Sequence, residues 1–407
     1  MNPIKDKHII LGVTGSIACY KAADLASKLT QAGALVDVIL TESAVKFVQP
    51  ITFQSVTGRK ANVDKDLWND QGHVTHIGLG HAADLVVIAP ATANTLAKLA
   101  HGIADNLLSV TSLAATCPLM IAPAMDGGMF THPATQENLE ILKQRGAMIV
   151  GPEEGRFASG MVGLGRMSEP LTILDEIRRV LGTDGLLAGK KVVVTAGGTQ
   201  EPLDPVRYLT NRSSGKQGYA LAQAAVDMGA SVTLISAPTS LTPLAGADLV
   251  SVRTAAEMLD ATLEHTADAD ILLMAAAVAD FTPQSVAEEK IKKGEESLTL
   301  PLTRTADILL EVGSRKEKTG FPRLTVGFAA ESENLLANAA KKLSAKHLDM
   351  IAANDISAAD AGFGVDTNRV TLLFPDGSQQ PLDLMSKAEV SAAILKKCVA
   401  LLGVGGD

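Results

Sequence analysis

The sequence predicts an α/β fold in which two doubly wound, mostly parallel sheets follow one another along the chain. In both halves, short apolar runs rich in Val and Ile alternate with helical segments, a pattern typical of parallel sheets covered by helices on both faces. The first strand of each half is followed by a Gly-containing turn, at Gly15 and at Gly197. A length of 407 residues with 46% hydrophobic residues is enough for two or three domains with substantial cores.

The first half begins with a strand from Ile9 that leads through a Gly-Ser turn into a helix, because Leu25, Leu29 and Ala32 share one face of that segment. A helix over 173–181 closes this half. Four further strands are expected at 36–40, 85–89, 119–122 and 148–150. Residues 182–185 form a short linker, and the boundary is expected near Gly189, which gives domains over 1–189 and 190–407.

The second half repeats the order of strand, turn and helix from Lys191. Further strands are expected at 232–236, 249–252, 271–275, 325–328 and 350–353. The segments 369–374 and 380–383 are joined by Pro-Asp-Gly, which predicts a β-hairpin extension of this sheet. An amphipathic helix is expected over 386–402.

Composition limits the kind of partner. The net charge of −9 argues against a nucleic-acid or membrane-surface role, and 3% aromatic residues leave few base-stacking platforms. The three cysteines (Cys19, Cys117 and Cys398) are widely spaced and odd in number, which fits a reducing cytoplasm and no structural zinc. The apolar runs are too short to span a bilayer. We therefore expect a cytoplasmic protein that binds small molecules, with no nucleic-acid or membrane partner.

The stretch between the strand at 191–196 and the next helix is rich in Pro, Asp and Asn, so it is not expected to be helical. It carries Arg207, Asn211, Ser213, Ser214 and Lys216, and it ends at a helix N-terminus, where free backbone N–H groups can bind a phosphate. An ordinary surface loop is the alternative. A loop of roughly 20 residues inside a compact domain is usually functional, which favours a binding site.

Small and hydroxylic residues follow the strands of the first half. They are Gly15-Ser16, Thr41, Thr92 to Asn94, and Pro123 to Met125. Ligands of doubly wound sheets bind beyond the carboxyl ends of the strands, so these residues suit a nucleotide-like ligand. The alternative is that any such sheet carries small polar residues at its strand ends.

Acidic and basic residues gather in the second half. Asp280 follows a buried strand, three lysines lie within 289–293, and Lys342 and Lys346 share a helix face at i, i+4. Each lysine group alone could be a solvated surface, but together with Asp280 and the Ser-Ser-Gly-Lys loop they favour a triphosphate site with a divalent ion. No G-x-x-x-x-G-K-[ST] motif is present, which argues against a P-loop ATPase.

The motif D-P-V-R-Y-x-x-N-x-S-S-G-K-x-G over 204–218 resembles the ligase half of a family of bifunctional coenzyme A biosynthesis proteins, in which a phosphopantothenoylcysteine decarboxylase is fused to a phosphopantothenate-cysteine ligase. The resemblance covers nearly the whole chain. In the first half it includes G-S-I-A, P-A-T-A-N, G-x-A-D-N-L-L and P-A-M-x-x-x-M, and in the second A-A-V-A-D-F, E-K-I-K-K and A-A-N-D-I. It implies Rossmann-like sheets in both halves, the first of them flavodoxin-like.

For the first half, the resemblance implies a decarboxylase that holds FMN. The cofactor-binding residues would be Gly15, Ser16, Thr41, Thr92, Asn94, Asn106 and Met125. His76 matches the family's active-site histidine, and histidine is a residue type suited to proton transfer near neutral pH. The alternative for any lone histidine is a structural or exposed role.

Two positions of the first half depart from the family. Asp126 stands where an Asn normally binds the substrate carboxylate, and Ser159 stands where a Cys normally supplies a proton. An ionised Asp repels a carboxylate unless one of the two takes up a proton, and a hydroxyl is a far weaker acid than a thiol with pKa about 8.5. A protonated Asp126 could both bind the substrate and act as the acid. Asp126 and Ser159 remain catalytic candidates.

For the second half, the resemblance implies a CTP-dependent ligase that forms an acyl-cytidylate, with Asn211 needed for the attack of cysteine and Asp280 as the Mg²⁺ ligand. The CTP-binding residues would be Ala275, Ala276, Ala277, Asp280, Lys290, Thr305, Ala306, Asp307, Ile308, Phe328, Lys342 and Lys346. The substrate-binding residues would be Arg207, Ser213, Ser214, Gly215 and Lys216, together with the strand end at 275–277. The family's N-P-D-I is Thr-Ala-Asp-Ile here, which is a minor departure. A homo-oligomer is implied, with trimeric contacts in the first domain and dimeric contacts in the second.

Two other interpretations stay open at this point. In one, the ligase is active but the first half is a flavin-binding oligomerisation scaffold with little or no decarboxylase turnover, which Asp126 and Ser159 favour. In the other, the protein is an NAD(P) reductase, which is weak because neither turn has the G-x-G-x-x-G spacing. The intact His76 and flavin motifs favour the bifunctional interpretation.

Overall fold

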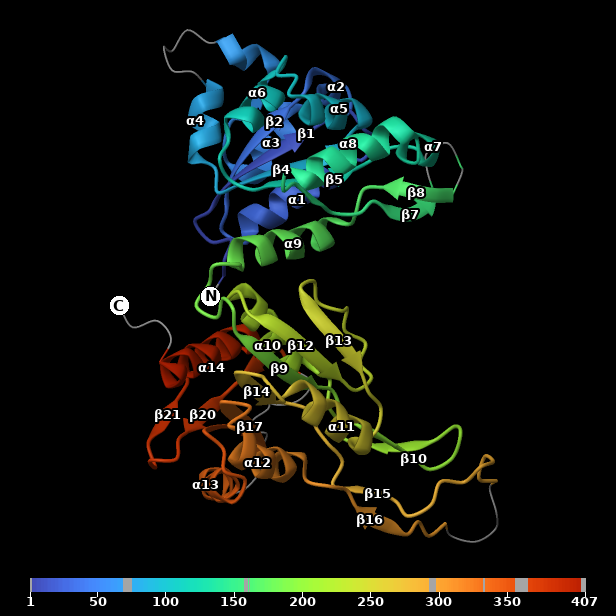
Figure 1. Ribbon diagram of the computed structural model, residues 1–407, viewed down its shortest axis with the longest axis vertical. Coiled ribbons are helices and arrows are strands. Elements are labelled where there is room, and N and C mark those ends of the chain that lie inside the picture. The colour runs from blue at the N-terminus through green and yellow to red at the C-terminus, as the bar shows by residue number, and fades with distance from the viewer. Residues whose placement is uncertain are drawn as a thin grey trace. The chain divides into compact units, whose positions relative to one another are not determined.

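The computed structural model describes residues 2–68, 75–156, 160, 162–292, 298–331, 334–355 and 365–403 (Figure 1). Their contacts divide the chain into two compact units, one over Asn2–Leu181 and one from Gly182 onward. The division falls before Gly189 because Leu187 is fully buried in the core of the second unit and its N–H donates to Met228 O at 2.7 Å.

The first unit is built on a six-stranded sheet in the order β3-β2-β1-β4-β5-β6, and its paired strands are all parallel. The strands are β1 (His8–Val13), β2 (Leu35–Leu40), β3 (Ala61–Val63), β4 (Leu85–Ala91), β5 (Leu119–Pro123) and β6 (Met148–Ile149). The helices are α1 (Cys19–Gln31), α2 (Glu42–Val45), α3 (Pro50–Thr57), the 3₁₀ turn η1 (Asp64–Trp68), α4 (Thr75–Ala82), α5 (Ala93–His101), α6 (Leu107–Ala114), α7 (Gly127–Phe130), α8 (Pro133–Gln144) and α9 (Pro170–Gly182). A hairpin of β7 (Glu153–Arg156) and β8 (Val162–Arg166) lies outside the sheet.

The sheet is buried on both faces, as its continuous apolar runs predict. Ile9 and Leu11 of β1 pack in one core cluster with α1, α3 and α9, whereas Ile10 packs in a second cluster with α5, α6 and α8. The strand order reverses between β1 and β4, and in open α/β sheets ligands bind beyond the carboxyl ends of the strands at such a reversal. Without the short edge strand β3, the order is that of a flavodoxin-like sheet, so the predicted fold class is confirmed.

The second unit has an eight-stranded sheet in the order β13-β12-β9-β14-β17-β18-β20-β21. The strands are β9 (Lys191–Ala196), β12 (Ser231–Ser236), β13 (Ala247–Ser251), β14 (Ile271–Met274), β17 (Leu324–Glu331), β18 (Met350–Asp355), β20 (Val370–Leu373) and β21 (Gln379–Pro381). The helices are α10 (Lys216–Asp227), α11 (Ala255–His265), α12 (Ile308–Thr319), α13 (Leu335–Ala345) and α14 (Lys387–Leu402). The strands are parallel up to β18, and the predicted hairpin of β20 and β21 continues the sheet in antiparallel fashion.

Short strand pairs outside the main sheet were not predicted. Three pairs occur among the described residues of the second unit: β10 (Gln200–Pro202) with β11 (Tyr208–Thr210), β15 (Phe281–Pro283) with β16 (Leu302–Arg304), and β19 (Thr367–Asn368) with β22 (Met385–Ser386). The first pair lies inside the stretch expected to be a loop. Runs of two or three residues contain too few positions for an alternating pattern to be visible. Figure 1 shows β15 and β16 extending away from the main sheet of this unit.

Candidate active site

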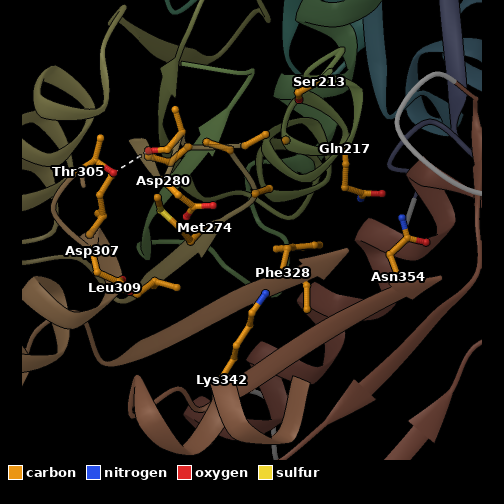
Figure 2. Close-up of a pocket in the computed structure, with 18 of the residues that line it drawn as sticks. Ser213, Gln217, Met274, Asp280, Thr305, Asp307, Leu309, Phe328, Lys342 and Asn354 are labelled. Carbon is orange, nitrogen blue, oxygen red and sulfur yellow. Dashed lines mark hydrogen bonds between the residues drawn. The ribbon is translucent and has the colours of Figure 1, made fainter. Parts of the chain in front are cut away.

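A cavity of about 770 Å³ lies at the carboxyl ends of β14, β17 and β18 and beside the N-terminus of α10 in the second unit (Figure 2). It brings together many of the predicted ligase residues, from segments far apart in the sequence. They are Ser213, Ser214, Gly215, Lys216, Ala275, Ala276, Ala277, Asp280, Thr305, Ala306, Asp307, Ile308, Phe328, Lys342 and Lys346. Arg207, Asn211 and Lys290 do not line it. Figure 2 shows Lys342 extending from α13 toward Phe328.

Two buried threonines hold the strand end that forms the cavity wall. Thr195 on β9 is fully buried, and its Oγ1 accepts a hydrogen bond from Ala276 N at 3.1 Å. Thr199 is also fully buried, and its Oγ1 accepts from Ala279 N at 2.9 Å. Ala277 N also donates to the carbonyl of Gly197, the residue after β9, at 2.8 Å. These three hydrogen bonds fix the backbone of 275–279 to the end of β9 and the turn that follows it.

Asn211 is attached to the same wall although it does not line the cavity. Its Nδ2 donates to Ala277 O at 3.3 Å and to Val278 O at 3.1 Å. The close approach needs glycine at 198, because a Cβ there would lie 2.9 Å from Asn211 O. The amide thus connects the loop of β10 and β11 to the strand end after β14.

The segment 305–307 is held against Asp280 and α13. Thr305 Oγ1 donates to Ala279 O at 2.6 Å, and Thr305 N donates to Asp280 O at 3.1 Å. Asp307 caps α12, and its Oδ2 lies 2.9 Å from Lys346 Nζ. The replacement of the family's Asn-Pro by Thr-Ala therefore leaves a segment with its own anchoring hydrogen bond.

Sequence reasoning missed a polar corner of the cavity that contains Gln217, Asn354, Asn368 and Lys387. Asn368 Nδ2 donates to Gln217 Oε1 at 3.0 Å, and Gln217 Nε2 donates to Ser391 Oγ at 2.9 Å. Gln217 and Asn354 belong to the motifs Ser-Ser-Gly-Lys-Gln-Gly and Ala-Ala-Asn-Asp, which could have indicated them. Asn368 and Lys387 stand in no motif that marked them.

Two lysines in this corner share one carboxylate. Lys216 Nζ lies 2.7 Å from Asp366 Oδ1. Burial lowers the pKa of Lys387, and the nearby charge of Lys216 lowers it further, whereas Asp366 partly restores it. For Asp366 itself, the hydrogen bond from Lys216 and its charge hold the pKa below the ordinary value. The corner therefore concentrates positive charge beside the N-terminus of α10, a placement that favours an anionic ligand.

The predicted flavin-binding residues of the first unit share the carboxyl edge of the sheet. Gly15 and Ser16 follow β1, Thr41 follows β2, and Met125 follows β5. The others cap or begin helices: Thr92 caps α5, Asn94 lies in its first turn, and Asn106 caps α6 with a capping box. Thr14 ties the two strands at the reversal, since its Oγ1 donates to Pro90 O at 2.7 Å and accepts from Thr92 N at 3.0 Å.

A second cavity of about 270 Å³ in this unit involves none of these residues. It lies near the start of β5, between the C-terminal ends of α5 and α8, and its lining includes Lys98, Cys117 and Arg145. Leu119, the first residue of β5, also lines it, so it opens at the other end of that strand from Met125.

Two of the three catalytic candidates of the first unit lie at short helices. His76 is on α4, and its Nδ1 is buried without a hydrogen-bond partner among the described residues. Asp126 caps α7, where its Oδ1 accepts from Gly128 N at 3.1 Å. Ser159 lies outside the described residues.

Across the described ranges, no three or more His, Cys, Asp or Glu side chains gather as a metal site. No helix in those ranges is long and apolar enough to cross a bilayer.

Each of the two units matches a model of a known protein family. The family model "DNA/pantothenate metabolism flavoprotein C-terminal domain" matches residues 187–402, and the model "Flavoprotein" matches residues 2–182. The "Coenzyme A biosynthesis bifunctional protein CoaBC" of Bacillus subtilis (strain 168) is 48% identical over 407 residues, which cover 99% of this chain and 99% of that protein.

Two solved structures are similar to single units. The C-terminal domain of a coenzyme A biosynthesis bifunctional protein CoaBC is 40% identical with a TM-score of 0.46, and it covers 54% of this chain and 98% of its own. A PPC decarboxylase mutant complexed with pantothenoylaminoethenethiol is 35% identical with a TM-score of 0.39, covering 43% of this chain and 97% of its own. On the full-length match, the chain belongs to the family of bifunctional coenzyme A biosynthesis proteins.

Proposed function

We propose that the second unit is a CTP-dependent phosphopantothenate-cysteine ligase and the first an FMN-dependent phosphopantothenoylcysteine decarboxylase. The observation that carries the proposal is the cavity of about 770 Å³, because it gathers residues that the motifs assign to CTP and to phosphopantothenate in one space. Membership of the family over both units supports two activities rather than a ligase on a non-catalytic scaffold.

In the ligase, a substrate carboxylate attacks the α-phosphate of CTP, which forms the acyl-cytidylate and releases pyrophosphate. The amine of cysteine then attacks the acyl carbon, which forms the amide and releases CMP. Lys342, Lys346 and the N-terminus of α10 offset phosphate charge. Asp280 would hold Mg²⁺, which in such sites is bound by one or two carboxylates together with the phosphates.

Asn211 offers the sharpest test of the ligase assignment. Its amide donates to two carbonyls of the cavity wall, and a carboxylate at this place would face both carbonyls without a proton to share. We expect Asn211→Asp to release pyrophosphate from CTP but to form little amide, so that acyl-cytidylate accumulates. The measurement is quenched-flow detection of pyrophosphate and CMP. Loss of CTP binding without any trapped intermediate would instead assign Asn211 to the nucleotide pocket.

The residues of the first unit fit FMN. A Cβ at Gly15 would lie 2.5 Å from Ser43 Cβ, so this position of the turn after β1 has no room for a side chain, and α1 has no acidic residue in its first turn to repel a phosphate. His76 Nδ1 is a buried polar atom still in need of a partner. Gly15, Ser16, Thr41, Thr92, Asn94, Asn106 and Met125 would hold the group.

FMN, when bound, supplies the two-electron oxidation of the substrate thiol and the later reduction. The residues of the chain do the rest: His76 accepts the proton of the thiol, and Asp126 or Ser159 returns a proton after the carboxylate is lost. Asn caps helices as well as Asp does, so Asp126→Asn keeps the start of α7. Native turnover that survives Asp126→Asn and fails in Ser159→Ala would assign the acid to Ser159. The purified protein should be yellow.

The proposal also covers the oligomeric state of the protein and its location in the cell. We propose a cytoplasmic homo-oligomer with trimeric contacts in the first unit and dimeric contacts in the second. Ile17 and Tyr20, both more than half exposed at the start of α1, offer apolar surface for such contacts. Sedimentation of the full chain and of each unit tests the numbers.

A further inference from the structure

Asp204 is a buried carboxylate at the base of the arm formed by β10, β11 and β15. It is 3% exposed. Its Oδ1 accepts from Val206 N and from Arg207 N, both at 2.7 Å. Its Oδ2 accepts from Ile291 N at 3.1 Å. The two oxygens therefore face two different segments of the chain.

These segments carry the cations that the motifs assign to substrates but that do not line the cavity. Arg207 is on one segment, and Lys290 precedes Ile291 on the other. A second bond joins them directly, because Arg207 Nη2 donates to Ile291 O at 2.7 Å. Arg207 Nε lies 3.7 Å from Asp204 Oδ2. Arg207 and the chain beside Lys290 thus form one hydrogen-bonded unit with Asp204 at its centre.

We propose that Asp204 is a positioning residue of the ligase, which holds Arg207 and Lys290 at a fixed separation so that both meet the anionic substrates together. The proposal rests on the ligase function proposed above. Without the carboxylate, the N–H groups of Val206, Arg207 and Ile291 lose their acceptor, and fewer hydrogen bonds, among them the one from Arg207 Nη2 to Ile291 O, keep the two segments at their separation. Fixing groups before binding lowers the entropy cost of association, so the loss should weaken substrate binding before it slows the chemistry.

The charge state of Asp204 agrees with this role. Burial opposes its ionisation, but the N–H groups of Val206, Ile291 and Arg207 and the charge of Arg207 outweigh burial and hold its pKa below the ordinary value. Because the carboxyl pKa is lowered by folding, the interaction is complete above the pKa of an Asp side chain in the unfolded chain, about 4. It is lost only as the pH falls through the lower pKa that Asp204 has in the folded protein. The arm is therefore held together throughout the neutral range.

The test uses Asp204→Asn in the full chain. An Asn oxygen in the place of Oδ1 still accepts from Val206 N and Arg207 N, whereas an NH₂ in the place of Oδ2 meets the N–H of Ile291 and breaks that link. We expect KM for CTP or phosphopantothenate to rise about tenfold, equivalent to one lost charged hydrogen bond, with kcat changed less than about threefold. The matched control is Asp376→Asn, since Asp376 accepts from Ser378 N in an exposed turn.

A double-mutant cycle with Lys290→Ala separates positioning from a merely structural role. If Asp204 acts through Lys290, Lys290→Ala should raise KM about tenfold in the native background and much less in the Asp204→Asn background. Additive effects, or an unchanged KM in Asp204→Asn, would overturn the inference. If Asp204→Asn does not fold, Ile291→Pro removes the same N–H from the other side and must give the same KM change. An inactive native protein would instead count against the ligase function itself.

Discussion

Replacing Thr195 by Val tests whether the cavity wall must be fixed for ligation. Thr195 is fully buried, its Oγ1 accepts from Ala276 N at 3.1 Å, and it donates to Met274 Sδ at 3.3 Å. Val has the same shape without the hydroxyl, so the half-buried N–H of Ala276 loses its acceptor. Leaving such a donor unpaired costs about 1–3 kcal/mol, and for a unit of this size each kcal/mol lowers the unfolding midpoint by about 2–4 °C.

The functional effect should exceed the effect on stability. A wall displaced by about 1 Å misplaces the reacting groups, which can cost about 100-fold in rate, so we expect ligase turnover to fall more than about tenfold. Thr195→Ser is the matched control, because it keeps the hydroxyl and removes only a methyl group, at a cost of about 1 kcal/mol. Calorimetry of the full chain and CMP release give the two readouts. Full turnover in Thr195→Val, or equal losses in both variants, would refute the reasoning.

Three further outcomes are expected. Lys21→Met should lower the free energy of unfolding of the first unit by about 1–3 kcal/mol, because the 2.8 Å hydrogen bond from its buried ammonium to Met167 O is lost. Calorimetry measures the change, and an unchanged unfolding midpoint would contradict this prediction. Burial raises the pKa of Cys398 to about 12, so a thiol reagent at pH 8 should label it only after unfolding, and rapid labelling of the native chain would show the core to be open. A fragment that begins at Gly182 should have a free energy of unfolding about 2–5 kcal/mol higher than one that begins at Lys190, because only the first keeps buried Leu187. Urea denaturation measures the difference, and equal unfolding midpoints would rule out that contribution.

The main sheets could be predicted because their strands are long apolar runs bounded by turns. The strand from Lys191 and the hairpin around Pro-Asp-Gly lie where the sequence indicates them. The edge strand β3 was missed, since three residues ending in Val63 show no period. β10 was missed for the same reason, and the turn between it and β11 is closed by a hydrogen bond from Val206 N to Asp204 Oδ1.

The site could be predicted where a motif marked it. Ser213, Asp280 and Lys342 meet in the cavity as their motifs indicate. Asn368 and Lys387 could not be found in this way, because each is a single polar residue in a segment that predicts only a hairpin or an amphipathic helix. Folding alone brings them next to α10.

The hairpin of β20 and β21 has a consequence for how pieces of this protein behave in solution. It covers the outer edge of β18, a strand whose Met350, Ile351 and Ala352 are buried. β21 is only three residues long and ends at Pro381, which has no N–H to offer another strand. A chain cut before the hairpin would expose the apolar edge of β18 as a template for strand addition, so we expect such fragments to aggregate.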